Sequence, residues 1–389
     1  MKKNTSPLNV IYLHTHDMGR YNSVYGYAIP TPNIHRFASR STTFHRAFCA
    51  GPTCSPSRAG LLTGQSAHSA GMIGLAHKGF KLADPQQHLG NFLKKHGYTT
   101  ALFGIQHEFD KTDEQDLAKM PYDYTVRNWH PDGCLQSDHR WTNAAVEYLQ
   151  RHHEQPFFLS LGLFYPHRPF LPADPEKFPA GYIKPPDPIP DTPETRQDMA
   201  DYHQSMFEAD ACLGRVMDTL RAQGLDQNSI LIVTTDHGPA FPGMKCNLTD
   251  HGIGVSLIMD YPGNPSRGKV ANGLVSQIDV FPTLCEILNF PAPEYLQGQS
   301  LLPIFEDPDV TIRDAVFAEV TYHAAYEPMR CVRTDRYNTS SGLARKSGVP
   351  RTAIHPLRNH FSWKTVGPKP ILKRTSSTTC SMIPVRVRT

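Results

Sequence analysis

The sequence predicts an α/β fold in which helices flank a mostly parallel central sheet. Short apolar runs that are typical of buried strands alternate with amphipathic runs that are typical of helices along most of the chain. Polar residues gather directly after several of the apolar runs, which is where ligands bind in parallel sheets. The 389 residues, of which 39% are apolar, suffice for one large core.

The expected elements follow one another in a regular order. Residues 9–15 form a predicted buried strand, and residues 32–41 form a predicted short helix that begins with proline. The apolar run after Cys54 predicts a helix that is closed by Gly64. Three helix–strand pairs and one further amphipathic helix are expected at residues 88–104, 139–164, 193–238 and 276–290.

The net charge of +3 conceals two segments of different composition. Residues 338–389 contain ten of the 39 basic residues and none of the 36 acidic ones. Residues 1–337 therefore carry a net charge of −7, so the charge gives no reason to expect nucleic acid as a partner. The eight cysteines are scattered and form no CxxC pair, which argues against a zinc ribbon and a disulfide framework.

The sequence gives no sign of export or of membrane insertion. Its basic start runs directly into a short β-like segment, without an apolar core or a cleavage site of small residues. No apolar run approaches the length of a membrane span. We therefore expect a cytoplasmic protein with no membrane partner, or a periplasmic or secreted one if the true start lies upstream.

Two predicted strands end in an Asp–His combination. His16 and Asp17 follow the first strand, and Asp236 and His237 follow a later one. Carboxylate oxygens that converge from adjacent strand ends are suitable ligands for a hard divalent cation. A single pair is more often a helix cap or a turn, so the two pairs favour a metal site without deciding it.

Three other polar residues lie near predicted strand ends. His107 and His167 each follow an apolar strand, where a lone histidine is more often structural than catalytic. Lys245 lies in a loop soon after Asp236, and by itself it is typical of a solvated loop lysine. These residues become candidates for catalysis only beside a reactive group.

Cys54 and Arg58 lie at the start of a predicted helix, in the stretch CSPSRAGLLTG. Free backbone N–H groups and the helix dipole at such a start favour an anion and lower the pKa of a thiol. Arg58 lies one turn further on and can present a bidentate fork to a tetrahedral oxyanion. The pattern indicates a sulfate or phosphate site, although a buried core thiol is the simpler interpretation of Cys54.

The same stretch resembles the sulfatase signature, in which Cys-x-Pro-Ser-Arg precedes a helix that ends in Leu-Thr-Gly. The resemblance continues through LFGIQHE, PFFLSLGLFYPHRPF, ILIVTTDHG and YEPMRCVRTDRY, and it covers nearly all of residues 8–337. GMIGL, PHRPF, the FP-x-x-K turn and YEPMR are most similar to the N-sulfoglucosamine sulfohydrolase (heparan N-sulfatase) branch. The resemblance implies an alkaline-phosphatase-like fold and a hydrolase that releases sulfate from a sulfated carbohydrate, through an ester or a sulfamate bond.

The resemblance also implies a nucleophile and a cofactor. In the family this cysteine is converted to formylglycine, which makes Cys54 the catalytic nucleophile and a formylglycine-generating enzyme a partner. One hydroxyl of the hydrated aldehyde attacks sulfur, and the other later expels sulfate. A calcium-type cation, or another divalent cation such as Mg²⁺, would acidify the nucleophile and take up charge.

The roles of the other candidates follow from the same resemblance. Arg58 and Lys245 would hold sulfate oxygens. His107 would assist the nucleophile, and His167 would protonate the leaving group. The implied cation ligands are His16, Asp17, Cys54, Asp236 and His237.

Three positions depart from the family pattern. His16 stands where an aspartate is usual, and His237 stands where asparagine is common. The lysine that usually touches both formylglycine and sulfate is absent, because the family's Gly-Lys-x-His reads GIQH at residues 104–107. Gln106 is the candidate for a partial replacement in substrate binding.

The resemblance ends at Tyr337, where the C-terminal subdomain of such sulfatases would continue. Loss of one base from codons for YKYIQRFGEKE yields the residues that stand from Tyr337 onward, and the same shift permits EDELYDLFDDPCEGAN at residues 373–389. We therefore expect a catalytic domain at 8–337, a truncated C-terminal subdomain and an out-of-frame segment at 338–389 that does not fold. A disordered basic tail is the simpler alternative.

Two alternatives to an active sulfatase stay open. Related folds use the same metal cluster to hydrolyse phosphonate or phosphate esters. The chain could also be an inactive, truncated homologue, since loss of C-terminal strands leaves an unpaired sheet edge and exposed apolar surface.

Overall fold

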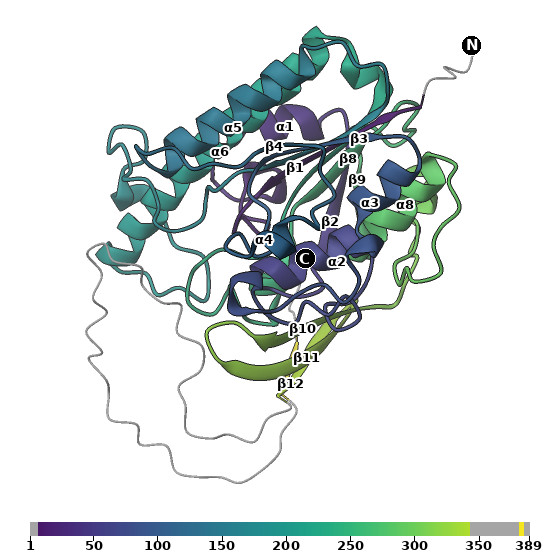
Figure 1. Cartoon of the computed structure of the whole chain (residues 1–389). Helices are drawn as coiled ribbons and strands as arrows, with labels where there is room; N and C mark the ends of the chain where they lie inside the picture. The colour runs from purple at the N-terminus through teal and green to yellow at the C-terminus, as the bar shows by residue number, and fades with distance from the viewer. Residues whose placement is uncertain (1–6, 343–380, 385–389) are drawn as a thin grey trace.

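The structure, a computed structural model, describes residues 7–342 and the backbone of residues 381–384 (Figure 1). Its centre is a large, mostly parallel sheet with helices on both faces, which confirms the predicted fold class. In spatial order the strands are β4 (Tyr124–Val126), β3 (Thr99–Gly104), β5 (Phe157–Gly162), β1 (Asn9–Thr15), β6 (Ser229–Thr235), β8 (Leu257–Asp260), β2 (Thr42–Phe48) and β7 (Gly254–Val255), with β9 (Val270–Ser276) paired to β2.

β1 lies at the centre of the parallel part of the sheet. It pairs in parallel with β5 on one side and with β6 on the other, so that Leu13 lies between Leu161 and Val233. β3 and β4 continue the parallel arrangement beyond β5, whereas β8 runs antiparallel to β6. Because β1, β5 and β6 end at the same edge, the residues that follow them meet there.

Alternate side chains of β1 enter two different cores, as the two-residue period of a strand requires. Ile11 and Leu13 pack on the face that α1, α5 and α6 cover, whereas Val10 and Tyr12 pack under α2, α3, α8 and α9 (Figure 1). The helices are α1 (Pro32–Ala38), α2 (Cys54–Thr63), α3 (Leu89–Lys95), α4 (Glu114–Leu117), α5 (Cys134–Leu149), α6 (Pro193–Ala222), α7 (Asp250–Ile253), α8 (Val280–Ile287) and α9 (Leu302–Glu306).

The predicted elements agree with the observed ones. The predicted first strand is β1, and α2 begins at Cys54 and is closed by Gly64, whose φ of 66° is the left-handed conformation of a helix C-cap. β9 was not predicted, because its sequence VANGLVS contains the asparagine and glycine that are typical of turns. β2 and β8 were not predicted either. No helix of the described residues has the length and apolar character that a membrane span needs.

A second, antiparallel sheet follows the main one. Its strands are β10 (Ala315–Tyr322), β11 (Tyr326–Thr334), β12 (Tyr337–Gly342) and β13 (Ser381–Pro384). The backbone N–H groups of Glu319 and Tyr322 donate to the carbonyls of Ala50 (3.0 Å) and Ile73 (3.1 Å). These bonds attach the second sheet to the segments that precede and follow α2.

β12 continues past the predicted domain boundary at Tyr337. It pairs with β11 as far as Gly342. A strand ladder uses backbone groups, which every sequence possesses, so this pairing does not test the reading frame and the out-of-frame hypothesis stays a prediction. Residues 343–380 and 385–389 of the predicted tail lie outside the described residues.

Candidate active site

The predicted metal ligands converge at the carboxyl edge of the main sheet. They come from the end of β1, the start of α2 and the end of β6. One ligand atom from each of the five residues lies within 4.8 Å of all the others, and all five residues are buried. We call this set, His16, Asp17, Cys54, Asp236 and His237, the strand-end cluster.

The two strand ends are joined directly at Asp17. This residue has a φ of 55°, a left-handed conformation that costs a non-glycine residue energy. In this conformation the Asp17 N–H donates to Asp236 Oδ1 at 2.8 Å. The bond fixes the separation of the two carboxylates.

His16 lies between these carboxylates. Its Nδ1 is 2.8 Å from Asp17 Oδ1 and 3.1 Å from Asp236 Oδ2. Burial lowers the pKa of His16, but the charges of Asp236, Cys54 and Asp17 outweigh burial and raise it to about 9. A cation that binds His16 therefore has to displace a proton.

Two buried cations neutralise the carboxylates. The Nζ of Lys245 donates to both oxygens of Asp17, at 2.9 and 2.8 Å, and one terminal nitrogen of Arg58 donates to Asp236 Oδ2 at 3.0 Å. The other terminal nitrogen of Arg58 contacts His14 Nδ1 at 2.5 Å. Arg58 and Lys245 would have to change partners before they could hold sulfate oxygens as predicted.

The strand-end cluster fits a hard divalent cation. Asp17 and Asp236 supply carboxylate oxygens, which calcium and magnesium prefer. The Nδ1 of His237 lies 2.9 Å from the carbonyl of Gly238, so a neutral ring donates there and keeps a lone pair on Nε2. This Nε2 is buried, makes no hydrogen bond of good geometry among the described residues, and lies 3.4 Å from Asp17 Oδ1 and 3.6 Å from Asp236 Oδ2, as expected for a ligand atom beside the other ligands.

Cys54 lies where a negative charge on its side chain is stabilised. It is the first residue of α2, and no side chain caps the free N–H groups there. Burial raises the pKa of the Cys54 thiol, but Lys245 and His16, with hydrogen bonds from His107 and His16, hold it well below its usual value. The same surroundings would stabilise an oxyanion at this position.

His107 and His167 lie half-buried beside the cluster as neutral rings. His107 Nδ1 is 3.4 Å from His16 Nε2, and His167 Nε2 is 3.8 Å from Asp17 Oδ2. Burial lowers the pKa of His107 to about 4 and that of His167 to about 3. The Nδ1 of His167 contacts the Arg168 carbonyl at 2.5 Å, which leaves its Nε2 as the acceptor that faces the cluster.

Gln106 is not directed to the cluster. Its amide nitrogen donates to the carbonyl of Phe109 at 2.9 Å, and its amide oxygen accepts from the N–H of Phe109 at 2.8 Å. Ile105, at the family's lysine position, is buried in the apolar core. Because both ends of the Gln106 amide are already bonded, neither residue takes over the role of the missing lysine in this structure.

The sequence analysis missed two residues beside the site. Glu108 is buried, and one of its carboxylate oxygens has no partner among the described residues; burial raises the pKa of this carboxyl, and Arg58 opposes the rise. His323 lies in the turn between β10 and β11, and burial lowers its pKa to about 4. In the sequence, only the position of Glu108 directly after His107 suggested a place near the site. No residue near His323 in the sequence predicted that the second sheet reaches the site.

Comparisons with known proteins show the family to which the chain is similar. The family model of sulfatases matches residues 8–290, and the model described as N-sulphoglucosamine sulphohydrolase, C-terminal, matches residues 245–341. The chain is 30% identical to N-sulphoglucosamine sulphohydrolase of Homo sapiens, over 88% of this chain and 75% of the human protein.

Solved structures establish the fold at lower identity. Ps i-CgsB in complex with k-i-k-neocarrahexaose has a TM-score of 0.71 and 21% identity, over 86% of this chain and 84% of that one. Phosphonate monoester hydrolase of Agrobacterium radiobacter has a TM-score of 0.70 and 18% identity, over 86% and 87% of the two chains. With the family match over residues 8–290, these findings show that the chain belongs to the sulfatase family, hydrolases that act on sulfuric esters and S–N bonds.

Proposed function

We propose that the protein is a formylglycine-dependent sulfohydrolase that uses a divalent cation to release sulfate from a sulfated carbohydrate. The observation that carries the proposal is the convergence of two carboxylates, two imidazoles and Cys54 within 4.8 Å. A formylglycine-generating enzyme would act on Cys54 as the partner, and calcium, or magnesium in its place, would be the cofactor. The cytoplasmic location stays a prediction.

The carboxylates and imidazoles of the strand-end cluster would hold the cation. When bound, it would act as a Lewis acid toward a sulfate oxygen and toward residue 54. Lys245, which is bonded to both oxygens of Asp17, would be free to hold a sulfate oxygen once Asp17 serves as a cation ligand. Arg58 would keep Asp236 in place through the bond that it already makes.

The two neutral histidines would move protons. His107 makes a hydrogen bond to the side chain at position 54 and, as a neutral ring, can accept a proton there. His167 needs a proton on Nε2 before it can donate to a leaving group. A bound anionic substrate favours the protonated ring, which supplies that proton when the site is filled.

The linkage of the sulfate is the finer part of the proposal. The similarity to human N-sulphoglucosamine sulphohydrolase, and the match of its C-terminal family model, favour a sulfamate on an amino sugar over a sulfate ester. The fold is also similar to that of a phosphonate monoester hydrolase, which keeps hydrolysis of phosphonate or phosphate esters as the second candidate. An inactive homologue is the third.

One assay separates these candidates. The full chain is produced together with a formylglycine-generating enzyme, and sulfate release from N-sulfoglucosamine and nitrophenyl sulfate is compared with phosphate release from nitrophenyl phosphate. We expect sulfate release that falls at least about 10⁴-fold in Cys54→Ala, because the covalent nucleophile is lost. Faster phosphate release would favour the second candidate, and no turnover by a protein that melts cooperatively would favour the third.

A further inference from the structure

One buried carboxylate near the candidate active site is not used by the proposed steps. Asp138 lies near the start of α5, and only 1% of its surface is exposed. Its Oδ1 accepts from the backbone N–H of Phe164 at 2.7 Å, and its Oδ2 accepts from that of Tyr165 at 3.0 Å. A single carboxylate on α5 therefore holds two successive peptide groups of the segment that follows β5.

The segment that Asp138 holds leads directly to His167. Phe164 and Tyr165 follow the end of β5, and His167 is two residues further along the chain. The carbonyl of Phe164 accepts from the N–H of His167 at 3.0 Å, which closes a turn. The ring of Phe164 also lies 5.0 Å from the ring of His167. Phe164 thus contacts His167 through its backbone and through its ring, and Asp138 fixes Phe164.

The orientation of the His167 ring depends on this turn. Its Nδ1 contacts the carbonyl of Arg168 at 2.5 Å, and its Nε2 lies 3.8 Å from Asp17 Oδ2. Because the Nδ1 contact is made to the neighbouring backbone, the direction of the ring follows the backbone at residues 167 and 168. A shift of that backbone would move Nε2, the atom assigned to the leaving group, away from the strand-end cluster.

The chain beyond His167 is anchored independently of Asp138. The Nε of Arg168 donates to the carbonyl of Ala240 at 2.9 Å, and its two terminal nitrogens bond the carboxylate of Asp198 in α6, one of them at 2.8 Å. We therefore expect loss of the bonds to Asp138 to displace the turn without releasing the whole segment.

Asp138 and the turn stabilise one another. Burial raises the pKa of the Asp138 carboxyl to about 7, and the N–H groups of Phe164 and Tyr165 oppose the rise. A carboxylate buried without such donors would be strongly destabilising. The same two bonds give the turn a partner that a neutral side chain of equal size could not fully replace, because an ionised acceptor makes the stronger hydrogen bonds.

We propose that Asp138 is a positioning residue for His167. By holding the N–H groups of Phe164 and Tyr165, it keeps the Nε2 of His167 at the place where the leaving group needs a proton. When the S–N bond of a sulfamate breaks, its electron pair stays on nitrogen, and that nitrogen takes the proton from Nε2. The inference rests on the proposed function, because His167 is the leaving-group acid in that mechanism.

Two kinds of leaving group test the inference. N-sulfoglucosamine and N-acetylglucosamine 6-sulfate lose an amine or an alcohol that has to be protonated, whereas nitrophenyl sulfate loses a stable anion that needs no proton. Asp138→Asn keeps one acceptor and puts a donor in place of the other, so we expect it to lower kcat/KM for the sugar that is hydrolysed by about tenfold or more. For nitrophenyl sulfate the change should be less than about threefold, which also shows that the variant is folded.

Asp210→Asn is the matched control. Asp210 is also a buried carboxylate that accepts from two successive backbone N–H groups, those of Asn33 at 3.0 Å and Ile34 at 2.8 Å, at the start of α1. Its replacement should affect the sugar and nitrophenyl sulfate equally. His167→Ala should reproduce the selective loss, and Asp138→Asn added to it should cause no further selective loss. If Asp138→Asn lowers both kinds of turnover equally, or neither, the positioning role is overturned and the proposed function stands.

Hydrogen exchange keeps this inference distinct from the proposed function, because it needs no turnover. The N–H of His167 is bonded to the carbonyl of Phe164, so its exchange reports on the turn itself. Asp138→Asn should speed this exchange about tenfold or more, and Asp210→Asn should leave it unchanged. If the unchanged chain releases no sulfate but this contrast is found, the proposed function fails and the positioning of residue 167 by Asp138 stands. Equal exchange at His167 in the unchanged chain and in Asp138→Asn overturns the inference.

Discussion

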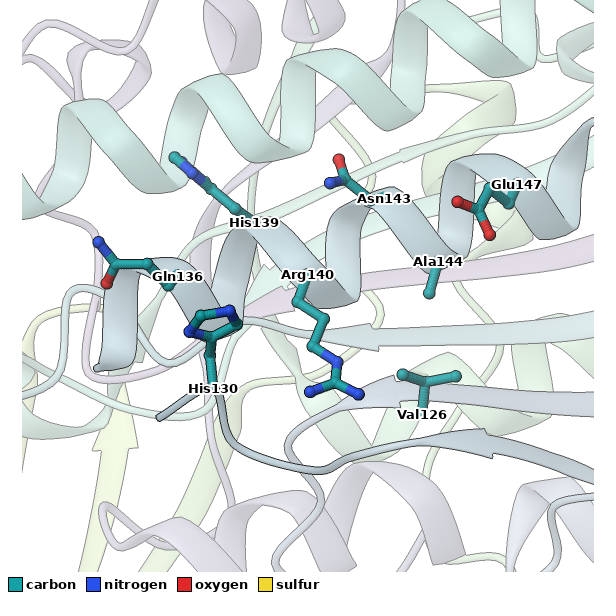
Figure 2. A pocket seen from close by; sticks show the side chains of 8 residues that line it. All are labelled: Val126, His130, Gln136, His139, Arg140, Asn143, Ala144 and Glu147. Carbon is teal, nitrogen blue, oxygen red and sulfur yellow. The ribbon is translucent and has the colours of Figure 1, made fainter. Parts of the chain in front are cut away.

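The strand-end cluster and the exposed side of α5 at Arg140 (Figure 2) use charged side chains in opposite ways. In the cluster Arg58 and Lys245 are buried and each is bonded to a carboxylate. On α5, Arg140 is exposed and without a partner among the described residues. Water solvates Arg140, whereas the charges of the cluster depend on one another because no water reaches them.

This difference separates buried charges, whose protonation depends on their neighbours, from an exposed charge that water solvates. Mutually dependent buried charges shift proton affinities strongly, as the raised pKa of His16 illustrates. We therefore expect a charge change in the cluster to affect folding as well as activity, and the same kind of change at Arg140 to leave folding unaffected.

The largest effect on stability is expected from the buried pair of Arg58 and Asp236. Asp236→Asn leaves the guanidinium buried without its countercharge and should lower the free energy of unfolding by about 3–5 kcal/mol. The matched change is Asp260→Asn, which breaks the partly exposed pair with Arg267 and should cost about 1 kcal/mol or less. Urea unfolding in the presence of a chelator measures both, and equal costs would contradict the contrast between buried and exposed charge.

A smaller effect, dependent on pH, is expected from a buried histidine without a countercharge. His88 accepts from the Gly90 N–H at the start of α3, and burial alone lowers its pKa to about 3. Since the unfolded value is near 6.5, the unfolded chain takes up this proton first. The stabilisation from neutral His88 is therefore complete above about pH 6.5 and is lost as the pH falls from there toward 3.

His88→Asn keeps a cap acceptor but removes the titrating group. Between pH 7 and pH 4.5 the unchanged chain should lose about 2–3 kcal/mol more of its free energy of unfolding than the variant does. Urea unfolding at the two pH values gives this difference. If the free energy of unfolding depends on pH identically in both proteins, burial does not lower the pKa of His88 as proposed.

The smallest effect on stability is expected at Arg140, on the exposed side of α5. Arg140→Gln should change the free energy of unfolding by less than about 0.5 kcal/mol, because the guanidinium is exposed and unpaired. Thermal and urea unfolding measure it. A loss above about 1 kcal/mol would mean that Arg140 supports α5, and would remove the contrast between the two regions.

Apolar runs and turn residues in the sequence predicted those parts of the site that depend on residues close together in the chain. β1 and α2 were found from apolar runs and from Gly64, and the meeting of Asp17 with Asp236 followed because both residues end strands of one parallel sheet. The resemblance to the sulfatases supplied the roles, which composition and periodicity could not give.

Long-range contacts explain what could not be predicted. Lys245 bonds to Asp17 across most of the chain, and His323 reaches the site from the second sheet, so neither arrangement has a local signal. Gln106 failed as a substitute for the missing lysine because its amide bonds Phe109 three residues away, a competition that side-chain type alone does not disclose.

The most direct test is the mass of the peptide that contains Cys54, taken from the full chain after production with a formylglycine-generating enzyme. We expect this peptide to carry formylglycine at position 54, because Cys54, Pro56 and Arg58 stand at the spacing of the sulfatase signature. The charges that surround Cys54 would also stabilise an oxyanion there. A peptide that keeps an unmodified cysteine, from cells in which a known sulfatase is converted, would contradict the proposed nucleophile and the mechanism built on it.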